Sequence, residues 1–338
     1  MSAGRNVLTP EALTMMDVIA RTGSFAAAAR ALGKVPSSLT YSVRQLEDAL
    51  DVLLFDRRSG QARLTAAGQE LLDEGRRLLE QIDAVANRVR RVATGWETQL
   101  GIALDGILSR PTVLELCEAF YAACASLSGG ASGAGTHSTR LKLRTEVLAG
   151  TWEALVTGQV DLAIGVGSDR LLPPGIRLKE LGSVRFVFAV APHHPLAAAS
   201  EPISDAELAR HRAVAVADSA QRLTPLTVNL LPEQDVLTVS SMQVKIDAQL
   251  RGLGCGFVPE PLARVHIDAG RLVAKPVQRA LRPVAMGYAW RAPETAGPEG
   301  DHAGLGLALR WWLEQLESPT TRRALLERHG NPAALGLA

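Results

Sequence analysis

The chain has 338 residues, more than a single hydrophobic core normally uses, so two or three domains are expected. Apolar residues make up 47% and charged residues 21%, as in ordinary globular proteins, and the formal net charge is only +1. No stretch is apolar over the roughly 18 residues of a membrane span, residues 1–10 lack the apolar run of a signal peptide, and the three cysteines do not form a disulfide framework. We therefore expect a protein of the reducing cytoplasm.

Positive charge is nevertheless concentrated near the N-terminus. Between Arg21 and Arg63 there are seven Lys and Arg residues against four Asp and Glu residues. A basic patch of this size on one small domain is sufficient for contact with the phosphates of a nucleic acid.

Three short helices are predicted in the first 50 residues. Thr9 is placed to cap the first, which begins at Pro10 and ends at Gly23; Ser24 is placed to cap the second, over 25–32. The third runs from Pro36 to about Leu50, with apolar residues at helical spacing. Such helices, the last two joined by a tight turn at Gly33, are typical of a helix-turn-helix. Residues 53–65 then read as two short strands around a Ser-Gly turn, a β-hairpin wing.

A long helix is predicted over 66–94. Its apolar residues follow one another at intervals of three and four, with Gly75 at one step: Leu71, Leu78, Ile82, Val85, Val89 and Val92. This is the pattern of a coiled-coil seam, so the helix is expected to dimerise. The alternative is a core helix of one domain.

Beyond Trp96 strands and helices alternate, which favours parallel α/β units. The expected strands are 99–104, 140–147, 162–166, 184–191, 213–217, 236–240, 256–259 and 284–291. The expected helices are 111–125, 151–157, 205–210, 242–253, 260–269 and 303–316. The Gly- and Ser-rich segment 126–138 is predicted to be a flexible loop.

Four runs of residues carry a resemblance to a known family. They are Gly23-Ser-Phe-Ala-Ala-Ala-Ala-Arg-Ala-Leu, Ser38-Leu-Thr-Tyr-Ser-Val-Arg-Gln-Leu-Glu, Leu54-Phe-Asp-Arg and Leu64-Thr-Ala-Ala-Gly. In order and spacing, over about 60 residues, they closely resemble the N-terminal signature of LysR-type transcription regulators. Two later pieces resemble the effector domain of that family more loosely, His194-Pro-Leu-Ala and Gly252-Leu-Gly-Cys-Gly-Phe-Val-Pro. Two further runs look most like a YhaJ-like subgroup associated with aromatic compounds, Val35-Pro-Ser-Ser-Leu-Thr-Tyr-Ser and Glu146-Val-Leu-Ala-Gly-Thr-Trp-Glu.

The resemblance implies a fold and a division of the chain. An N-terminal winged helix-turn-helix (1–65) and a long linker dimerisation helix (66–96) would precede an α/β effector domain (97–318) of two subdomains, like a periplasmic binding protein. Subdomain I would comprise 97–167 and 276–318, and subdomain II would comprise 168–275. Residues 319–338 would form a flexible tail.

The helix-turn-helix would read double-stranded DNA. The start of the third helix can enter the major groove, and the wing suits phosphates or a narrow minor groove. The candidate DNA-binding residues are Ser37, Ser38, Thr40, Tyr41, Arg44, Arg57, Arg58 and Arg63. Any one of them could instead be only a solvated surface residue. The chain departs from its family where Val35-Pro36-Ser37 replaces the usual Ser-Gln-Pro, and where Gly60 replaces a common second Arg of the wing, which leaves the operator sequence open.

In the effector domain a ligand would lie in the cleft at the carboxyl ends of the strands. The candidate effector-binding residues are Leu104, Asp105, Gly106, Leu148, Ala149, Gly167, Asp218, Ser219, Ser240 and Ser241. Asp105 stands near a position where many family members carry a small hydroxyl residue and bind carboxylates. A carboxylate there would repel an acid but accept a hydrogen bond from a phenol or quinol, so a neutral hydroxylated aromatic is the hypothesis. The alternative is that Asp105 only caps the following helix.

No catalytic, metal or cofactor site is expected. His193 and His194 are adjacent in a loop and cannot easily share one tetrahedral ion, and Cys117, Cys124 and Cys255 lack the basic neighbours that would lower a thiol pKa. The expected partners are a pseudo-palindromic operator, a small-molecule effector, further copies of the chain as a dimer of dimers, and RNA polymerase if the protein activates. Two rivals remain: an effector-independent architectural DNA-binding protein, and an enzyme or solute-binding domain fused to a DNA anchor.

Overall fold

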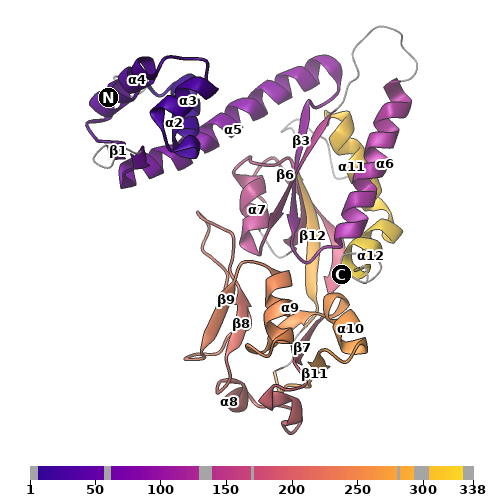
Figure 1. The fold of residues 1–338 in the computed structure, drawn as a ribbon. Helices are drawn as coiled ribbons and strands as arrows, with labels where there is room; N and C mark the ends of the chain where they lie inside the picture. Colours follow the sequence, from indigo (N-terminus) through magenta and orange to yellow (C-terminus); the bar gives the residue numbers. More distant parts are fainter. Residues whose placement is uncertain are drawn as a thin grey trace. The chain divides into compact units, whose positions relative to one another are not determined.

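The computed structural model describes residues 7–56, 62–128, 139–168, 171–279, 282–292 and 304–329 (Figure 1). The chain divides into two compact units, Met1–Val89 and Arg90–Ala338. In the described part of the chain, no helix is both long and apolar enough to cross a membrane.

The first unit contains the three predicted helices, α2 (Pro10–Thr22), α3 (Phe25–Ala31) and α4 (Pro36–Leu50). The hydroxyl of Thr9 accepts a hydrogen bond from the Ala12 N–H at 3.2 Å, and Gly23 closes α2 in the left-handed conformation with φ 66°. These contacts satisfy backbone groups at both ends of the helix. The predicted caps and the helix-turn-helix are therefore confirmed.

A small apolar core joins these helices to the wing. Its fully buried members come from all three helices and from the residues just after them: Met16, Ile19, Ala28, Leu39, Val43, Leu46, Leu54 and Phe55. Strand β1 (Phe55–Asp56) pairs antiparallel with β2 (Arg63–Leu64). The buried carboxylate of Glu47 accepts from the N–H of Leu54 at 2.9 Å and of Phe55 at 3.3 Å, which ties the wing to α4.

The long helix α5 (Ala66–Thr94) begins against this core. Two glycines allow the close approach, since an added Cβ would lie 2.0 Å from the Leu54 carbonyl oxygen at Gly68 and 2.9 Å from Leu13 Cδ2 at Gly75. The next seam positions are uncovered, with exposures between 44% and 66%: Leu78, Ile82, Val85 and Val89. Among the described residues nothing covers this apolar stripe. The side chain of Val92, the last predicted seam position, is not described.

The second unit contains a five-stranded sheet in the order β4-β3-β5-β12-β6 (Figure 1). Its strands are β3 (Gln99–Asp105), β4 (Arg140–Glu146), β5 (Leu162–Gly167), β6 (Ile176–Val184) and β12 (Val284–Arg291). The pairs of β3 with β4 and β5 are parallel, but β12 runs antiparallel to β5 and β6, so the sheet is mixed.

Helices cover both faces of this sheet. On one face α6 (Arg110–Ser128), α11 (Leu307–Glu317) and α12 (Pro319–Glu327) bury a core that includes Phe120 and Trp312. On the other face α7 (Ala149–Val156) buries Trp152 and Leu155.

A second group of strands forms the other subdomain. Strand β7 (Phe186–Val190) pairs antiparallel with β10 (Gly256–Pro259) and β11 (Val273–Ala274), and β8 (Ala213–Val216) pairs parallel with β9 (Val236–Val239). A bridge between Ala213 and Cys255 connects the two groups. Helices α8 (Asp205–Leu208), α9 (Met242–Leu250) and α10 (Glu260–Asp268) pack with them.

Three details differ from the sequence-based expectation. Residues 176–184, assigned to subdomain II and not predicted as a strand, form β6 in the sheet of subdomain I, where they pair antiparallel with β12. The short strand β11 was also missed. Residues 319–327 form α12 rather than a flexible tail, because Ser318 caps it and Leu325 and Leu326 are buried against the sheet domain. Residues 330–338 of the predicted tail, and 129–138 of the predicted loop, lie outside the described residues.

Candidate functional site

The exposed side of α4 carries the candidate DNA-reading residues. Ser37, Arg44 and Tyr41, the last 63% exposed, present their side chains to solvent. The Ser38 hydroxyl donates to the Val35 carbonyl at 2.8 Å and the Thr40 hydroxyl donates to the Pro36 carbonyl at 3.0 Å. The oxygens of these two hydroxyls therefore remain as acceptors, while their protons are committed to the helix.

One further residue of this surface was missed from the sequence. The Gln45 side-chain amide donates to the Tyr41 hydroxyl oxygen at 3.1 Å, one turn apart on the exposed side of α4. The signal was available, because residues four apart lie on the same face of a helix. Gln45 therefore restrains the Tyr41 ring on the exposed side of α4.

The start of α4 offers backbone donors as well. No side chain caps the start of this helix, because Val35 stands at the capping position and has no polar side-chain atom. Pro36 occupies the first helical position. Uncapped N–H groups at a helix start attract phosphate oxygens. Arg63 is exposed on the described part of the wing, whereas Arg57 and Arg58 lie outside the described residues.

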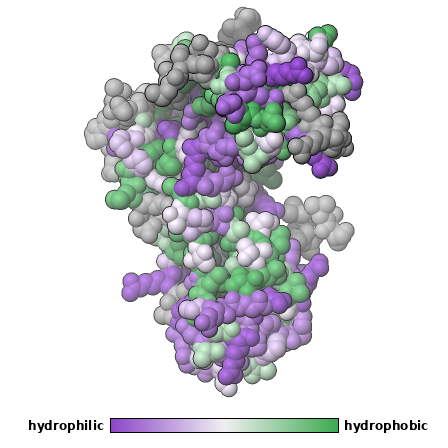
Figure 2. All heavy atoms as spheres, turned by 90° about the vertical axis from the view of Figure 1, so that its left-hand side faces the viewer, coloured by the Kyte–Doolittle hydropathy of each residue, from purple (hydrophilic) through white to green (hydrophobic). Residues whose placement is uncertain are grey.

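In the second unit a cavity of about 270 Å³ lies where the two subdomains meet. Its walls are Asp105, Gly106, Ile107, Val147, Leu148, Phe186, Ala215, Val216, Val228, Asn229, Met242, Lys245, Phe257, Arg282, Val284 and Met286. Most of these side chains are apolar, two of them aromatic. On the face drawn in Figure 2, apolar side chains also gather at the level of β8, β9 and the segment between them, to which Val228 belongs.

The cavity takes in three of the ten candidate effector residues, Asp105, Gly106 and Leu148. Leu104 is 8% exposed and belongs to the core behind them. Ser241 caps α9 by accepting from the Val244 N–H at 3.3 Å. The others lie nearby without lining the cavity: Ala149, Gly167, Asp218, Ser219 and Ser240.

Asp105 is the acid of this cavity. Burial raises the pKa of its carboxyl group to about 7, against the lowering effect of the N–H groups of Ile107 and Leu148; Asp218 raises it slightly further. Its Oδ1 accepts from the Ile107 N–H at 3.0 Å, whereas the first turn of α6 is capped by Ser109. Gly165 of β5 has φ 92°, and an added Cβ there would lie 2.6 Å from Asp105 Cβ, so this close approach requires glycine.

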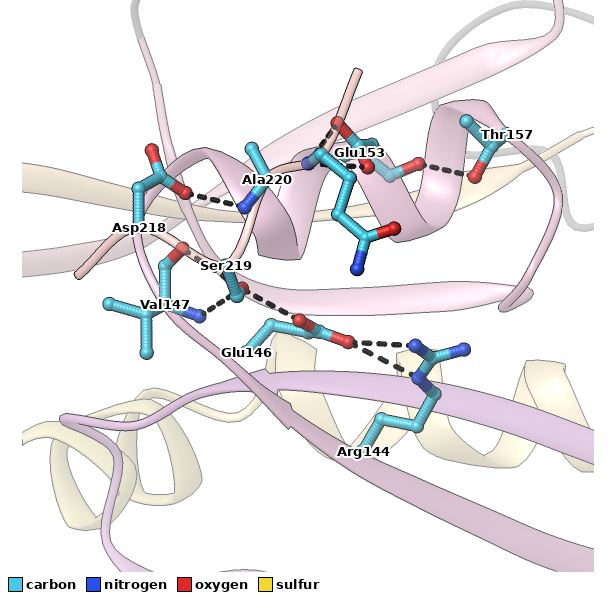
Figure 3. A network of polar contacts seen from close by, with 9 residues as sticks. Arg144, Glu146, Val147, Glu153, Thr157, Asp218, Ser219 and Ala220 are labelled. Atoms are coloured by element: carbon cyan, nitrogen blue, oxygen red, sulfur yellow. Dashed lines mark hydrogen bonds and ion pairs between the residues drawn. The ribbon is translucent and has the colours of Figure 1, made fainter. Parts of the chain in front are cut away.

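Asp218 contacts the start of α7 and does not line the cavity; Figure 3 shows the bond that it accepts from the Ala220 N–H. Its carboxylate accepts four backbone N–H bonds of 2.7–3.2 Å, from Ala149, Gly150, Ala220 and Leu226. Residues 149 and 150 open α7, so a carboxylate of the chain itself already occupies this helix N-terminus.

Ser219 completes the contact between loop and helix (Figure 3). Its hydroxyl donates to Glu146 Oε2 at 2.7 Å and accepts from the Val147 N–H at 2.9 Å. Further along α7, the carboxylate of Glu153 accepts hydrogen bonds from the N–H groups of residues 221, 222 and 223, which follow Ser219 in the loop. Sequence reasoning missed Glu146 and Glu153, because nothing local indicates that a loop about 70 residues away returns to them.

Lys245 of α9 was likewise not predicted. It lines the cavity with an exposure of only 8%, and burial lowers the pKa of its ammonium group to about 8. The other titratable candidates are structural: His194 Nδ1 accepts from the Leu196 N–H at 3.2 Å, and burial raises the pKa of Cys255 to about 11. Among the described residues no group of three His, Cys, Asp or Glu side chains could hold a metal ion.

Two family descriptions match the chain. Residues 10–69 match the bacterial regulatory helix-turn-helix protein of the lysR family, and residues 137–318 match the LysR substrate binding domain. The chain therefore belongs to the LysR family of DNA-binding transcription regulators. It is 39% identical over 315 residues to the probable HTH-type transcriptional regulator YhaJ of Escherichia coli K12, covering 93% of this chain and 97% of that one. This confirms the resemblance to the YhaJ-like subgroup.

Other relatives and solved structures agree with this assignment. The uncharacterized regulator YeeY of Escherichia coli K12 is 36% identical over 90% of this chain and 92% of its own length. The crystal structure of CbnR, a LysR family regulator, has a TM-score of 0.51 at 18% identity, covering 91% of this chain and 98% of that chain. CbnR complexed with its target DNA has a TM-score of 0.52 at 19% identity, covering 90% and 98%. The expected fold, a winged helix-turn-helix and linker helix before a two-subdomain effector domain, is confirmed.

Proposed function

We propose that this regulator binds a hydroxylated aromatic molecule, phenol- or quinol-like, in the cavity around Asp105, and that occupancy changes how its winged heads bind DNA. The observation that carries the proposal is an acid of pKa about 7 in a cavity whose walls are mostly apolar. A hydroxyl group can donate to such an acid, while the ring contacts the apolar walls.

The size and chemistry of the cavity support a single aromatic ring. A dry apolar cavity of roughly 150 Å³ is enough to hold benzene, so a cavity of about 270 Å³ has room for a ring with substituents. Phe186 and Phe257 offer aromatic contacts, and Val216 and Met286 offer aliphatic ones.

The neighbouring carboxylate of Asp218 disfavours a simple acid as ligand. It accepts hydrogen bonds from the N–H groups at the start of α7, and its negative charge raises the pKa of Asp105. A ligand carboxylate placed beside Asp105 would meet two acidic groups without gaining those donors.

For the DNA half, the proposal is a dimer that binds a pseudo-palindromic operator in the cytoplasm. The uncovered stripe of α5 supports dimerisation through that helix, and two heads related by a two-fold axis fit a symmetric site. Effector domains would pair two dimers into a tetramer, and an activating form would contact RNA polymerase. Neither half of this proposal assigns the protein an enzymatic reaction.

The test is a thermal-unfolding screen of the full chain with phenol, hydroquinone, benzoate and succinate, followed by calorimetric titration. The hydroxylated rings are expected to raise the unfolding temperature, and the two acids to leave it unchanged. Tight binding of benzoate or succinate without binding of the phenols would overturn the aromatic proposal.

A cavity-filling substitution tests whether the stabilising compounds bind in this cavity. Val216→Phe occupies space in the cavity and should abolish the stabilisation, whereas Leu172→Phe, at a half-exposed position outside the cavity, should retain it. A ligand can act on transcription only if it binds two arrangements of the protein with different affinity, so operator affinity with and without ligand must differ. If no compound raises the unfolding temperature, the result favours an effector-independent architectural DNA-binding protein instead.

A further inference from the structure

The cavity holds a cation that the proposed function does not use. Lys245 follows Met242 by one turn of α9, and both side chains line the cavity. Burying an ammonium group with 8% exposure is costly unless it is paired. Within the described ranges no carboxylate or other acceptor hydrogen-bonds or ion-pairs with its Nζ, so none of these residues neutralises its charge.

A second polar side chain without a partner lies beside it. Gln249, one turn further along α9, has an exposure of 0%, and both its amide oxygen and its amide nitrogen lack hydrogen-bond partners in the described part of the chain. A Cβ added to Gly256 would lie 3.1 Å from Gln249 Nε2 and 3.3 Å from Lys245 Nζ. The two side chains therefore converge at one place on β10, next to Phe257 of the cavity wall.

Most buried polar groups in proteins have a hydrogen-bond partner, so an unpaired cation in the wall of a cavity, with an unpaired buried amide beside it, indicates a ligand atom. Asp105 lies on β3 of the first sheet, whereas Lys245 lies on α9 of the other subdomain, and no ion pair joins them among the described residues. Asp105 thus faces the cavity from one subdomain and Lys245 from the other, and the exposed Arg282 is a second cation of the wall.

We infer that Lys245, supported by Gln249, is the subsite for a second oxygen of the effector. The ligand is an aromatic ring with one hydroxyl that donates to Asp105 and another oxygen, as a phenolate, nitro or quinol oxygen, that accepts from Lys245. This inference rests on the proposed function and narrows it from phenols in general to rings with two oxygen-bearing substituents. Such a ligand contacts both subdomains at once and would hold them in one arrangement.

The experiment compares phenol, which has one oxygen, with hydroquinone and 4-nitrophenol by calorimetric titration of the full-length protein. The wild type should bind the two-substituent rings about tenfold more tightly than phenol, since a hydrogen bond to a charged group is worth roughly that factor. Lys245→Met removes the charge but keeps an unbranched side chain, and should reduce the ratio to about threefold or less. Lys245→Arg should retain most of the preference, because it keeps a cation.

The outcomes separate the two proposals. If phenol and the two-substituent rings bind the wild type equally well, the Lys245 subsite is wrong and the proposed function stands. A preference that survives in Lys245→Met also overturns the subsite. If no ring binds the wild type, both fall. Thermal unfolding of each variant without ligand shows that it is folded, and Gln249→Leu, which should lower the same ratio, provides an independent second variant.

Discussion

The carboxylate of Asp218 accepts a hydrogen bond of 3.1 Å from the N–H of Gly150, in the first turn of α7, although Asp218 and Gly150 are 68 positions apart in the sequence. The loop after β8 is thereby attached to the helix that covers the sheet of the other subdomain. Gly150 permits this contact, because an added Cβ would lie 1.9 Å from Ser219 Oγ.

Replacing this carboxylate should loosen the contact. Asp218→Asn removes the negative charge at the start of α7 and replaces a carboxylate that accepts four N–H bonds with a weaker, neutral acceptor. The substitution should therefore lower the free energy of unfolding by about 1–3 kcal/mol. Hydrogen exchange should rise in residues 218–226 and in the first turn of α7. Asp235→Asn, at an exposed ion pair with Arg212, is the control and should change stability by less than about 0.5 kcal/mol. Equal effects of both substitutions would show that the loop is not held by Asp218.

The pH dependence of stability should carry the signature of Asp105. Its pKa of about 7 in the folded protein exceeds the unfolded value, so between about pH 4 and 7 the folded state binds more protons and stability falls as the pH rises. Asp105→Asn removes this titration and should raise the unfolding temperature more at pH 8 than at pH 5. Thermal unfolding at the two pH values measures it.

The matched control for that experiment is Glu314→Gln on the exposed side of α11. It should shift the unfolding temperature by the same small amount at pH 5 and pH 8. Lys245 does not interfere, because its lowered pKa of about 8 makes its own contribution vary mainly above that pH. A pH profile of Asp105→Asn that parallels the wild type would contradict the buried-acid assignment.

Operator binding should depend on Arg44. Arg44→Ala removes an exposed cation from α4 and should weaken DNA association; if Arg44 contacts a phosphate, the slope of log affinity against log salt should fall by about 0.9. Fluorescence anisotropy over a salt series measures both quantities. Arg210→Ala, an exposed cation of the effector domain, should leave them unchanged. Stabilisation by an effector should survive in Arg44→Ala, and its loss would refute the division into two functional halves.

The stripe on α5 should govern the oligomeric state. Leu78→Glu together with Ile82→Glu places charges at two uncovered apolar positions and should convert dimers to monomers. Sedimentation velocity would show the change. Asn87→Glu, off the seam on the same helix, adds a like charge and should leave dimers intact. Dimers that persist in the double variant would place the interface elsewhere.

Local patterns in the sequence were sufficient for most elements. The caps at Thr9 and Ser24, the start of α4 at Pro36 and the full length of α5 follow from turn chemistry and helical spacing, and the structure confirms them. The family signature of the first 70 residues is equally local. Segment 176–184 was missed because its apolar residues alternate only at 176 and 178 and then follow at intervals of three, at 181 and 184, where the pairing register with β12 shifts.

The residues that line the cavity, and their charges, could not be predicted from local patterns in the sequence. Asp105 was chosen from its place after a strand, but its raised pKa results from burial by residues of both subdomains. Lys245 and Gln249 look like ordinary polar residues of a surface helix, and only packing of α9 against β8 and β10 buries them. The amino-acid sequence by itself thus determined the helix-turn-helix and the family, since both depend on neighbours along the chain. The tertiary structure decided which charges enter the cavity and which bind the backbone, because desolvation and hydrogen bonding depend on residues that meet only after folding.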